Sequence, residues 1–263
     1  MYAVEYQKPK SLADAAAALA RTGGKPLAGG QSLVAAMKLR LAQPGTIVDL
    51  AGIPELAGIR KDGNAIVIGA MARHADVASS EDVKRAIPAL AEGIGDRQVR
   101  NMGTLGGSIA NSDPAADWPA ALVALNATVV TNKRRIAAGD FFKGMYETAL
   151  AADEIVTGVS FPIPKKAAYA KFPNPASRFA LVGVFVAQGA DGSVRVAVTG
   201  AAPSVFRAAA LEAALAKSFT ADAAKGVKID ASGLNNDLHG SPTYRAHLIS
   251  VMAARAVAAA AAG

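Results

Sequence analysis

The chain has 263 residues and contains no cysteine. Cysteine thiolates bind iron–sulfur clusters and many structural zinc ions, and they form disulfides. The sequence therefore excludes these centres, together with cysteine nucleophiles, from this chain. Any metal redox centre that works with the protein must belong to a partner.

A secretory leader and long apolar runs are also lacking. The N-terminal sequence MYAVEYQKPK has no charged start followed by an apolar stretch. No apolar run approaches the length of about 18 residues that a membrane-spanning helix needs. We therefore expect a cytoplasmic protein with no membrane span.

Acidic residues are fewer than basic ones, with 21 Asp and Glu against 28 Lys and Arg, so the net charge is +7. This sign favours acidic partners, phosphorylated ligands or polyanions. No aromatic residue is interleaved with the basic clusters at 133–135 and 165–166 to stack on bases. A basic nucleic-acid-binding protein, whose binding would weaken with salt, is an alternative, but we expect no nucleic-acid partner.

Hydrophobic side chains make up 52% of the chain, enough for one large domain or two modest ones. A capping box at Ser11 and helical spacing up to Gly23 predict a first helix. Residues 25–28 read as a short strand, and a second helix is expected over 32–41. This alternation predicts a mixed α/β fold.

The mixed pattern continues with strands at 46–50, 128–130 and 154–161, a hairpin over 59–68 that turns at Asp62 and Gly63, and a helix over 80–94 that Pro88 kinks or shortens. Asp113 and Pro114 suit the N-cap and first position of a helix through Leu125.

A domain boundary is expected near residue 166, where four prolines flank a linker-like stretch. Beyond it, 179–187 and 193–199 read as two strands joined at Asp191 and Gly192. Alanine-rich helices finish the chain.

The segment AGGQS, Ala28 to Ser32, places two glycines between a predicted strand and a predicted helix. Glycine lets backbone N–H groups approach an anion, and a helix N-terminus adds donors and partial positive charge. The arrangement suits a phosphate, although paired glycines are also common in ordinary turns.

The segment TLGGS, Thr104 to Ser108, repeats this device in a polar loop. Two such loops suit a ligand with two phosphates. Asp113 reads first as a helix N-cap, whereas Asp117 could hold a ribose or ribityl hydroxyl. Neither loop matches the Rossmann or Walker A glycine pattern, which disfavours an ordinary NAD domain or a P-loop NTPase.

Three stretches, PLAGGQSLVAAMKLRLAQP, NMGTLGGSIANSDPAADWPAAL and DLHGSPTYRAHL, closely resemble the medium, FAD-binding subunit of the xanthine dehydrogenase and carbon monoxide dehydrogenase family. The resemblance covers essentially the whole chain. It implies a FAD domain of the vanillyl-alcohol oxidase and MurB type over residues 1–166, in two α/β subdomains divided near 55–60. A smaller C-terminal α/β domain of the carbon monoxide dehydrogenase flavoprotein type would occupy 167–263.

The resemblance also implies which residues would bind FAD, noncovalently. Two glycine segments would surround the pyrophosphate, Val156 would lie near the adenine or flavin, and Lys171 near the flavin. The expected set is Leu27, Ala28, Gly29, Gly30, Gln31, Ser32, Leu33, Thr104, Gly106, Gly107, Ser108, Ala110, Asp117, Val156, Lys171 and Phe179. Without the resemblance, Lys171 would read as a solvated cation at a strand end.

The resemblance breaks at the face of the flavin. Relatives of the carbon monoxide dehydrogenase type have an Asp-Tyr pair there, whereas this chain has Arg178 and Phe179. A phenyl ring can pack over a flavin but cannot donate a hydrogen bond, so reactivity toward the final electron acceptor cannot be carried over. The charge of Arg178 would tend to raise the flavin potential.

In such assemblies a molybdenum subunit converts the substrate, an iron–sulfur subunit relays electrons, and the flavin exchanges them with an acceptor. We therefore expect this chain to be the flavoprotein subunit of a molybdenum-containing hydroxylase, without a catalytic side chain of its own. Its partners would be an iron–sulfur small subunit and a molybdenum large subunit, in a dimer of heterotrimers. A stand-alone FAD-dependent oxidase or reductase is the alternative enzyme.

The three histidines, His74, His239 and His247, lack metal-ligand spacing and are expected to have structural roles. The segment HGSPTYR is expected to form a turn into the last helix, anchored by Tyr244 and Arg245.

Overall fold

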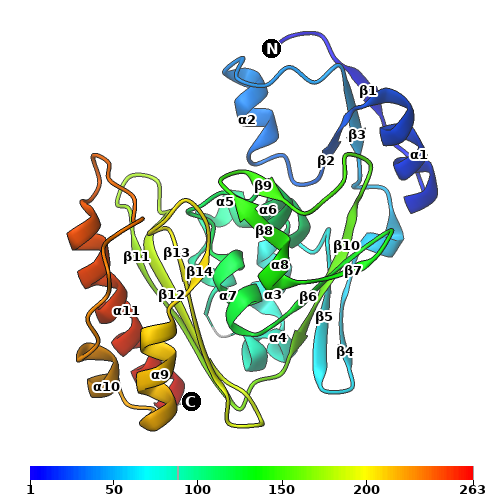
Figure 1. The fold of residues 1–263 in the computed structure, drawn as a ribbon. Coiled ribbons are helices and arrows are strands. Elements are labelled where there is room, and N and C mark those ends of the chain that lie inside the picture. The colour runs from blue at the N-terminus through cyan, green and yellow to red at the C-terminus, as the bar shows by residue number, and fades with distance from the viewer. Residues whose placement is uncertain (88, 263) are drawn as a thin grey trace.

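A computed structural model describes residues 1–87 and 89–262 and arranges them in three packed units. The N-terminal unit lies at one end, the C-terminal sheet and its helices lie at the other, and the largest sheet lies between them (Figure 1). The mixture of helices and strands confirms the predicted α/β class.

The N-terminal unit is a small parallel sheet in which β3 (Thr46–Asp49) lies between β1 (Glu5–Gln7) and β2 (Lys25–Leu27). Helix α1 (Leu12–Thr22) packs on β3, and α2 (Leu33–Lys38) follows the first glycine segment. Parallel strands need such crossover connections.

Helix α1 has the predicted ends. The Ser11 side chain accepts a hydrogen bond from the backbone N–H of Asp14, and Gly23 ends the helix at a φ of 62°. Helix α2 is shorter than predicted, because it ends at Lys38 and leaves Leu41 outside it and 79% exposed. The expected apolar face of this helix therefore does not include Leu41.

The middle unit is a five-stranded antiparallel sheet in the order β4-β5-β10-β6-β7. Its strands are β4 (Ile59–Asp62), β5 (Ala65–Gly69), β6 (Thr128–Thr131), β7 (Arg135–Ala137) and β10 (Val156–Pro162). The segments around it are η1 (Pro54–Leu56), α3 (His74–Ser79), α4 (Glu81–Ala86), η2 (Ala91–Gly93), α5 (Arg97–Met102), α6 (Leu105–Asn111), α7 (Trp118–Ala124), α8 (Ala138–Phe141), β8 (Phe142–Gly144) and β9 (Glu147–Thr148). Trp118, Phe141 and Phe161 are fully buried in its core.

The C-terminal unit is an antiparallel sheet in the order β11 (Lys166–Pro173), β12 (Ala180–Gln188), β13 (Val194–Thr199) and β14 (Phe206–Arg207). One face is covered by α9 (Ala209–Lys217), α10 (Ala221–Lys225) and α11 (Pro242–Ala262), and α7 packs on the other (Figure 1). Because both faces are covered, β12 is buried along almost its entire length.

Helix α11 is long and apolar enough to cross a membrane by length and composition. In this fold 56% of its most apolar window is buried, because the helix packs on β11 and β12. A core helix of a folded domain passes the same test, so this feature is weak evidence for a membrane span.

Four local predictions are corrected by the structure. The hairpin turns one residue late, at Gly63 and Asn64. The single helix over 80–94 is wrong, because α4 ends at Ala86 and a separate turn, η2, follows; Pro88 lies outside the described residues.

The other two corrections concern the second glycine segment and its surroundings. The predicted polar loop there is helix α6, and the next helix begins at Trp118. Asp113 caps only a turn, because its carboxylate accepts from the N–H of Ala115 at 2.9 Å, and Asp117 takes the N-cap position of α7.

Candidate functional site

The first glycine segment leaves a row of backbone donors without partners. Residues 29 to 32 lie between β2 and α2, and none of their N–H groups donates to an acceptor in the described part of the chain. Gly30 has a φ of 73°, in the left-handed region that glycine tolerates best. Ser32 precedes α2 without capping it through its side chain. Such a row at a helix N-terminus suits an anion.

The two glycine segments contact each other. A Cβ built on Gly29 would lie 2.0 Å from the carbonyl oxygen of Met102 and 2.8 Å from the Cα of Gly103. A Cβ on Gly107 would lie 3.2 Å from the Cβ of Ala28. Two segments that lie far apart in the sequence therefore pack backbone against backbone.

The second segment is nevertheless built differently from the first. The N–H groups of Leu105 and Gly106 donate to the carbonyl groups of Ala72 and Ala70, at 3.1 and 2.8 Å. Those of Gly107 and Ser108 donate to the side-chain hydroxyl and the carbonyl of Thr104. All four donors are therefore occupied, and the glycines here provide space: a Cβ on Gly106 would lie 2.5 Å from the Cβ of Ala70.

A buried histidine holds this second segment against α7. The N–H of His74 donates to the carbonyl of Gly103 at 2.9 Å, and its ring Nδ1 accepts from Trp118 Nε1 at 3.2 Å. Burial, reinforced by the charge of Arg100, lowers the pKa of His74 to about 4. The ring is neutral near pH 7 and its contacts are structural, as the sequence predicts.

Asp117 and Lys171, both predicted ligands, form a buried ion pair. The Lys171 ammonium lies 3.0 Å from Asp117 Oδ1 and donates to the carbonyl of Gly93 at 2.7 Å. Tyr169 donates to the same carboxylate at 2.5 Å. Burial raises the pKa of Asp117, while Lys171 and Tyr169 act to lower it. Lys171 is thus no solvated strand-end cation, since its side chain is 10% exposed.

The remaining predicted residues lie at differing depths. Val156 is buried in the middle core, one residue before Thr157, whose carbonyl accepts from the N–H of Ala70 behind Gly106. Ala110 is exposed on α6. Phe179 is 48% exposed and lies just before β12, and in the described part of the chain no side-chain hydrogen bond or ring contact joins it to the glycine segments.

The sequence pattern does not reveal the residues that pack behind the candidate site. Met102, Gly103 and Ala70 contribute mainly backbone, so their side chains carried no signal. Tyr169 carried one: residues two apart on a strand share a face, so Tyr169 accompanies Lys171 toward α7. Gly183 completes this arrangement, because a Cβ there would lie 2.2 Å from the Tyr169 hydroxyl oxygen.

The segment HGSPTYR anchors the last helix as predicted. Arg245 is 2% exposed and donates to the carbonyl groups of Leu181 and Gly200, at 2.8 and 3.0 Å. It also pairs with Asp237. Tyr244 makes an edge contact with Phe172, so both predicted anchors touch the C-terminal sheet.

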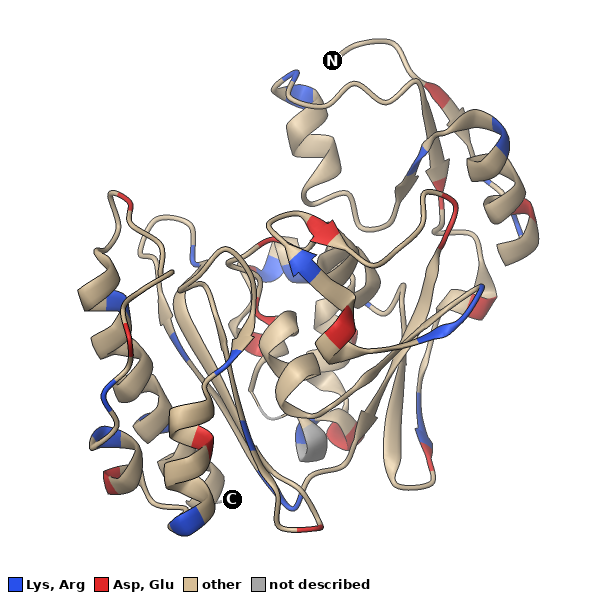
Figure 2. Cartoon of the chain, in the orientation of Figure 1, with Lys and Arg blue, Asp and Glu red and all other residues tan. Residues whose placement is uncertain are grey.

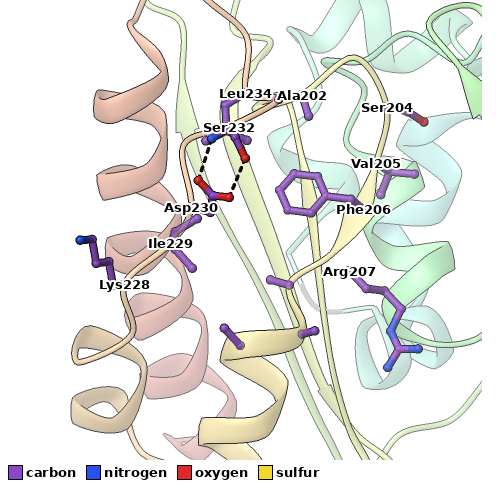
Figure 3. Close-up of a pocket in the computed structure, with 14 residues that line it drawn as sticks. Ala202, Ser204, Val205, Phe206, Arg207, Lys228, Ile229, Asp230, Ser232 and Leu234 are labelled. Atoms are coloured by element: carbon purple, nitrogen blue, oxygen red, sulfur yellow. Dashed lines mark hydrogen bonds between the residues drawn. The ribbon is translucent and has the colours of Figure 1, made fainter.

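A hollow of about 500 Å³ lies elsewhere, in the C-terminal unit (Figure 3). Phe206 and Arg207 from β14 line it on one side, and the segment from Lys228 to Leu234 lines the other. Asp230 is occupied by hydrogen bonds from Ser232. None of the predicted ligand residues lines this hollow, so it is separate from the glycine segments.

Comparison with known proteins agrees with this geometry. Residues 2–164 match the family described as the FAD binding domain in molybdopterin dehydrogenase, and residues 167–260 match the carbon monoxide dehydrogenase flavoprotein C-terminal domain. The chain belongs to this flavoprotein family.

Similar proteins match this flavoprotein over nearly its whole length. It is 36% identical to the nicotine 6-hydroxylase medium subunit of Paenarthrobacter nicotinovorans, over 97% of this chain and 96% of that one. It is 37% identical to the carbon monoxide dehydrogenase medium chain of Hydrogenophaga pseudoflava, with the same coverage. The solved carbon monoxide dehydrogenase of the latter organism, lacking the Mo-pyranopterin moiety, aligns with a TM-score of 0.87 at 36% identity, over 99% of this chain and 98% of that one.

The residues present fit FAD. The free N–H groups of the first glycine segment offer donors for a phosphate. Because the residues of the second glycine segment are small, that segment faces the first with its backbone and not with side chains. The chain is therefore a FAD-binding oxidoreductase subunit of the molybdenum hydroxylase type.

Proposed function

We propose that this flavoprotein holds FAD between its two glycine segments and passes electrons from an iron–sulfur subunit to an external acceptor. Bound FAD supplies both one-electron and two-electron chemistry, which lets it link a cluster to an acceptor. The observation that carries the proposal is the row of free N–H groups at residues 29 to 32, next to the N-terminus of α2.

The protein's own groups bind and orient; none is assigned a proton transfer. The N–H groups of residues 29 to 32 would bind the pyrophosphate, and the Thr104 to Ser108 segment would pack beside it. The Asp117–Lys171 pair fixes a carboxylate and an ammonium at the seam between the middle and C-terminal units. Phe179, with its ring half exposed, would offer an apolar face to the flavin.

The residue-level assignment and the assembly are parts of the same proposal. It covers the sixteen predicted ligand residues, the domain boundary near 166, and noncovalent attachment, since the chain has no cysteine and the first glycine segment carries Gln31 and no histidine. It also covers a cytoplasmic dimer of heterotrimers with iron–sulfur and molybdenum subunits. Similar proteins are named medium subunits or medium chains, which supports a multi-subunit assembly.

Purification tests the proposal directly. The protein should be yellow, and acid denaturation should release FAD, and not FMN, into the supernatant. Under anaerobic conditions, substrate of the complex should bleach the flavin only when iron–sulfur and molybdenum subunits are present. Flavin that stays in the precipitate would contradict noncovalent binding. Substrate-driven bleaching of the lone chain would instead support a stand-alone oxidase.

A further inference from the structure

The end of α2 presents two leucines to solvent on a rigid turn. Leu39 is 70% exposed and Leu41 is 79% exposed, on either side of Arg40. We call residues 39 to 41 the LRL knob. Large apolar side chains exposed together commonly mark interaction surfaces.

The backbone fixes the LRL knob in place. The N–H of Leu41 donates to the carbonyl of Ala36 at 2.8 Å, and that of Arg40 donates to the carbonyl of Met37 at 3.1 Å. These are the two hydrogen bonds of a Schellman motif. Arg40 occupies the left-handed position, with a φ of 61°, where glycine is usual. A strained arginine is thus held in a turn that points two leucines outward.

The usual packing of this motif is missing. A Schellman turn commonly buries the residue in the place of Leu41 against the helix. Here the helix offers only Ala36 at the matching position, and Leu41 stays in solvent. The free chain therefore gains no burial from either leucine, which is the arrangement expected of a surface that a partner covers.

The charge around the LRL knob is basic. Figure 2 shows Lys and Arg colour, without Asp or Glu colour, at the end of α2. Arg40 stacks over the ring of Tyr2, with its guanidinium carbon 5.5 Å from the ring centroid. No carboxylate in the part of the chain that the structure describes pairs with Lys38 or Arg40. Arg and Tyr are the residue types enriched at interface anchors.

We infer that the LRL knob inserts into an apolar pocket with an acidic rim on the iron–sulfur partner. This inference rests on the proposed function. Helix α2 begins at the glycine segment proposed to bind the FAD pyrophosphate, so a subunit docked at its other end lies beside the proposed FAD site. The six residues of α2 place the leucines about 9 Å along the helix from the glycine segment.

The test compares Leu39→Asp/Leu41→Asp with Leu238→Asp in the tagged chain, each co-expressed with its iron–sulfur and molybdenum subunits. Leu238 is fully exposed, but lies in the C-terminal unit, and so controls for a charge at an exposed leucine. The double variant should keep its flavin and melting temperature, and bind the iron–sulfur subunit on the order of 100-fold more weakly. Leu238→Asp should bind it normally.

Charge reversal gives an independent readout. Lys38→Glu should weaken the complex and reduce its sensitivity to salt, because an attraction to the acidic rim is lost. Normal binding by the double variant, or equal loss in Leu238→Asp, would overturn the inference. The inference would also be overturned if the double variant bound the iron–sulfur subunit normally and instead lost self-association, binding to vesicles or binding to the molybdenum subunit. Lack of flavin in the wild-type chain would instead refute the proposed function.

Discussion

Gly29 lies directly against the carbonyl group of Met102, where a Cβ would come within 2.0 Å of the oxygen. Met102 ends α5, immediately before the second glycine segment. The two segments therefore form one packed structure, so a change at Gly29 acts on both. A side chain at Gly29 would therefore meet the neighbouring backbone as well as the proposed ligand.

Gly29→Ala should lose FAD and also destabilise the protein, because the methyl group meets backbone that cannot rotate away. The cost should be roughly 1–3 kcal/mol, as for overpacking in a core. Gly45→Ala is the matched control, since a Cβ there meets nothing within 4 Å. Visible absorbance and urea unfolding measure both effects; wild-type flavin content in Gly29→Ala would refute the packed-segment assignment.

Gly107→Ala should be milder, because its nearest neighbour is the Thr104 side-chain oxygen, at 2.9 Å. Loss of the Thr104 cap should cost about 1 kcal/mol and weaken FAD binding without abolishing it. Titration of apoprotein with FAD measures the affinity. A loss of affinity as complete as that of Gly29→Ala would show that the second segment contributes more than space.

Lys171→Met should destabilise the protein by about 3 kcal/mol or more, because it leaves the Asp117 carboxylate buried without its cation. Adding Asp117→Asn should recover much of that loss, since the buried charge is then removed. Lys165→Met, at an exposed position, is the control. Strictly additive costs in denaturant unfolding would show that the two groups do not interact.

The sequence could predict those features of the fold that depend on local residue patterns. Ser11 and Gly23 mark both ends of α1 because a cap and a left-handed stop are local signals. The sequence also reveals both glycine segments, but not the difference between them. Whether a backbone N–H group in the second segment is free depends on Ala70 and Ala72, which follow a strand far away in the sequence. The polar, small-residue stretch around TLGGS predicts a loop, yet the segment begins helix α6, because tertiary contacts and the Thr104 cap override the low helix propensity of glycine.

Arg245→Met should cost roughly 3 kcal/mol or more, because two buried carbonyl groups, of Leu181 and Gly200, lose their donor. Arg255→Met, at an exposed position of the same helix, should change stability by no more than about 0.5 kcal/mol. Thermal unfolding compares them. Equal effects would mean that the anchor assigned to HGSPTYR contributes little.

The last prediction concerns pH. The pKa of His74 is about 4 in the folded protein, against 6.5 as the ordinary value, because the ring is buried and lies near Arg100. Below pH 6.5 the unfolded chain binds a proton at His74 that the folded ring does not bind. The free energy of unfolding therefore falls as the pH drops toward 4, and this group has no effect on it above 6.5. The difference amounts to about 3 kcal/mol in total.

His74→Gln should remove most of this part of the pH dependence, because an amide can accept from Trp118 but does not titrate. His247→Gln, at an exposed position on α11, should leave it unchanged. The free energy of unfolding, measured in urea from pH 7 to pH 4.5, tests the difference between the two variants, so that carboxylates common to both cancel. Parallel curves for both would show that His74 is not the group that resists protonation in the fold.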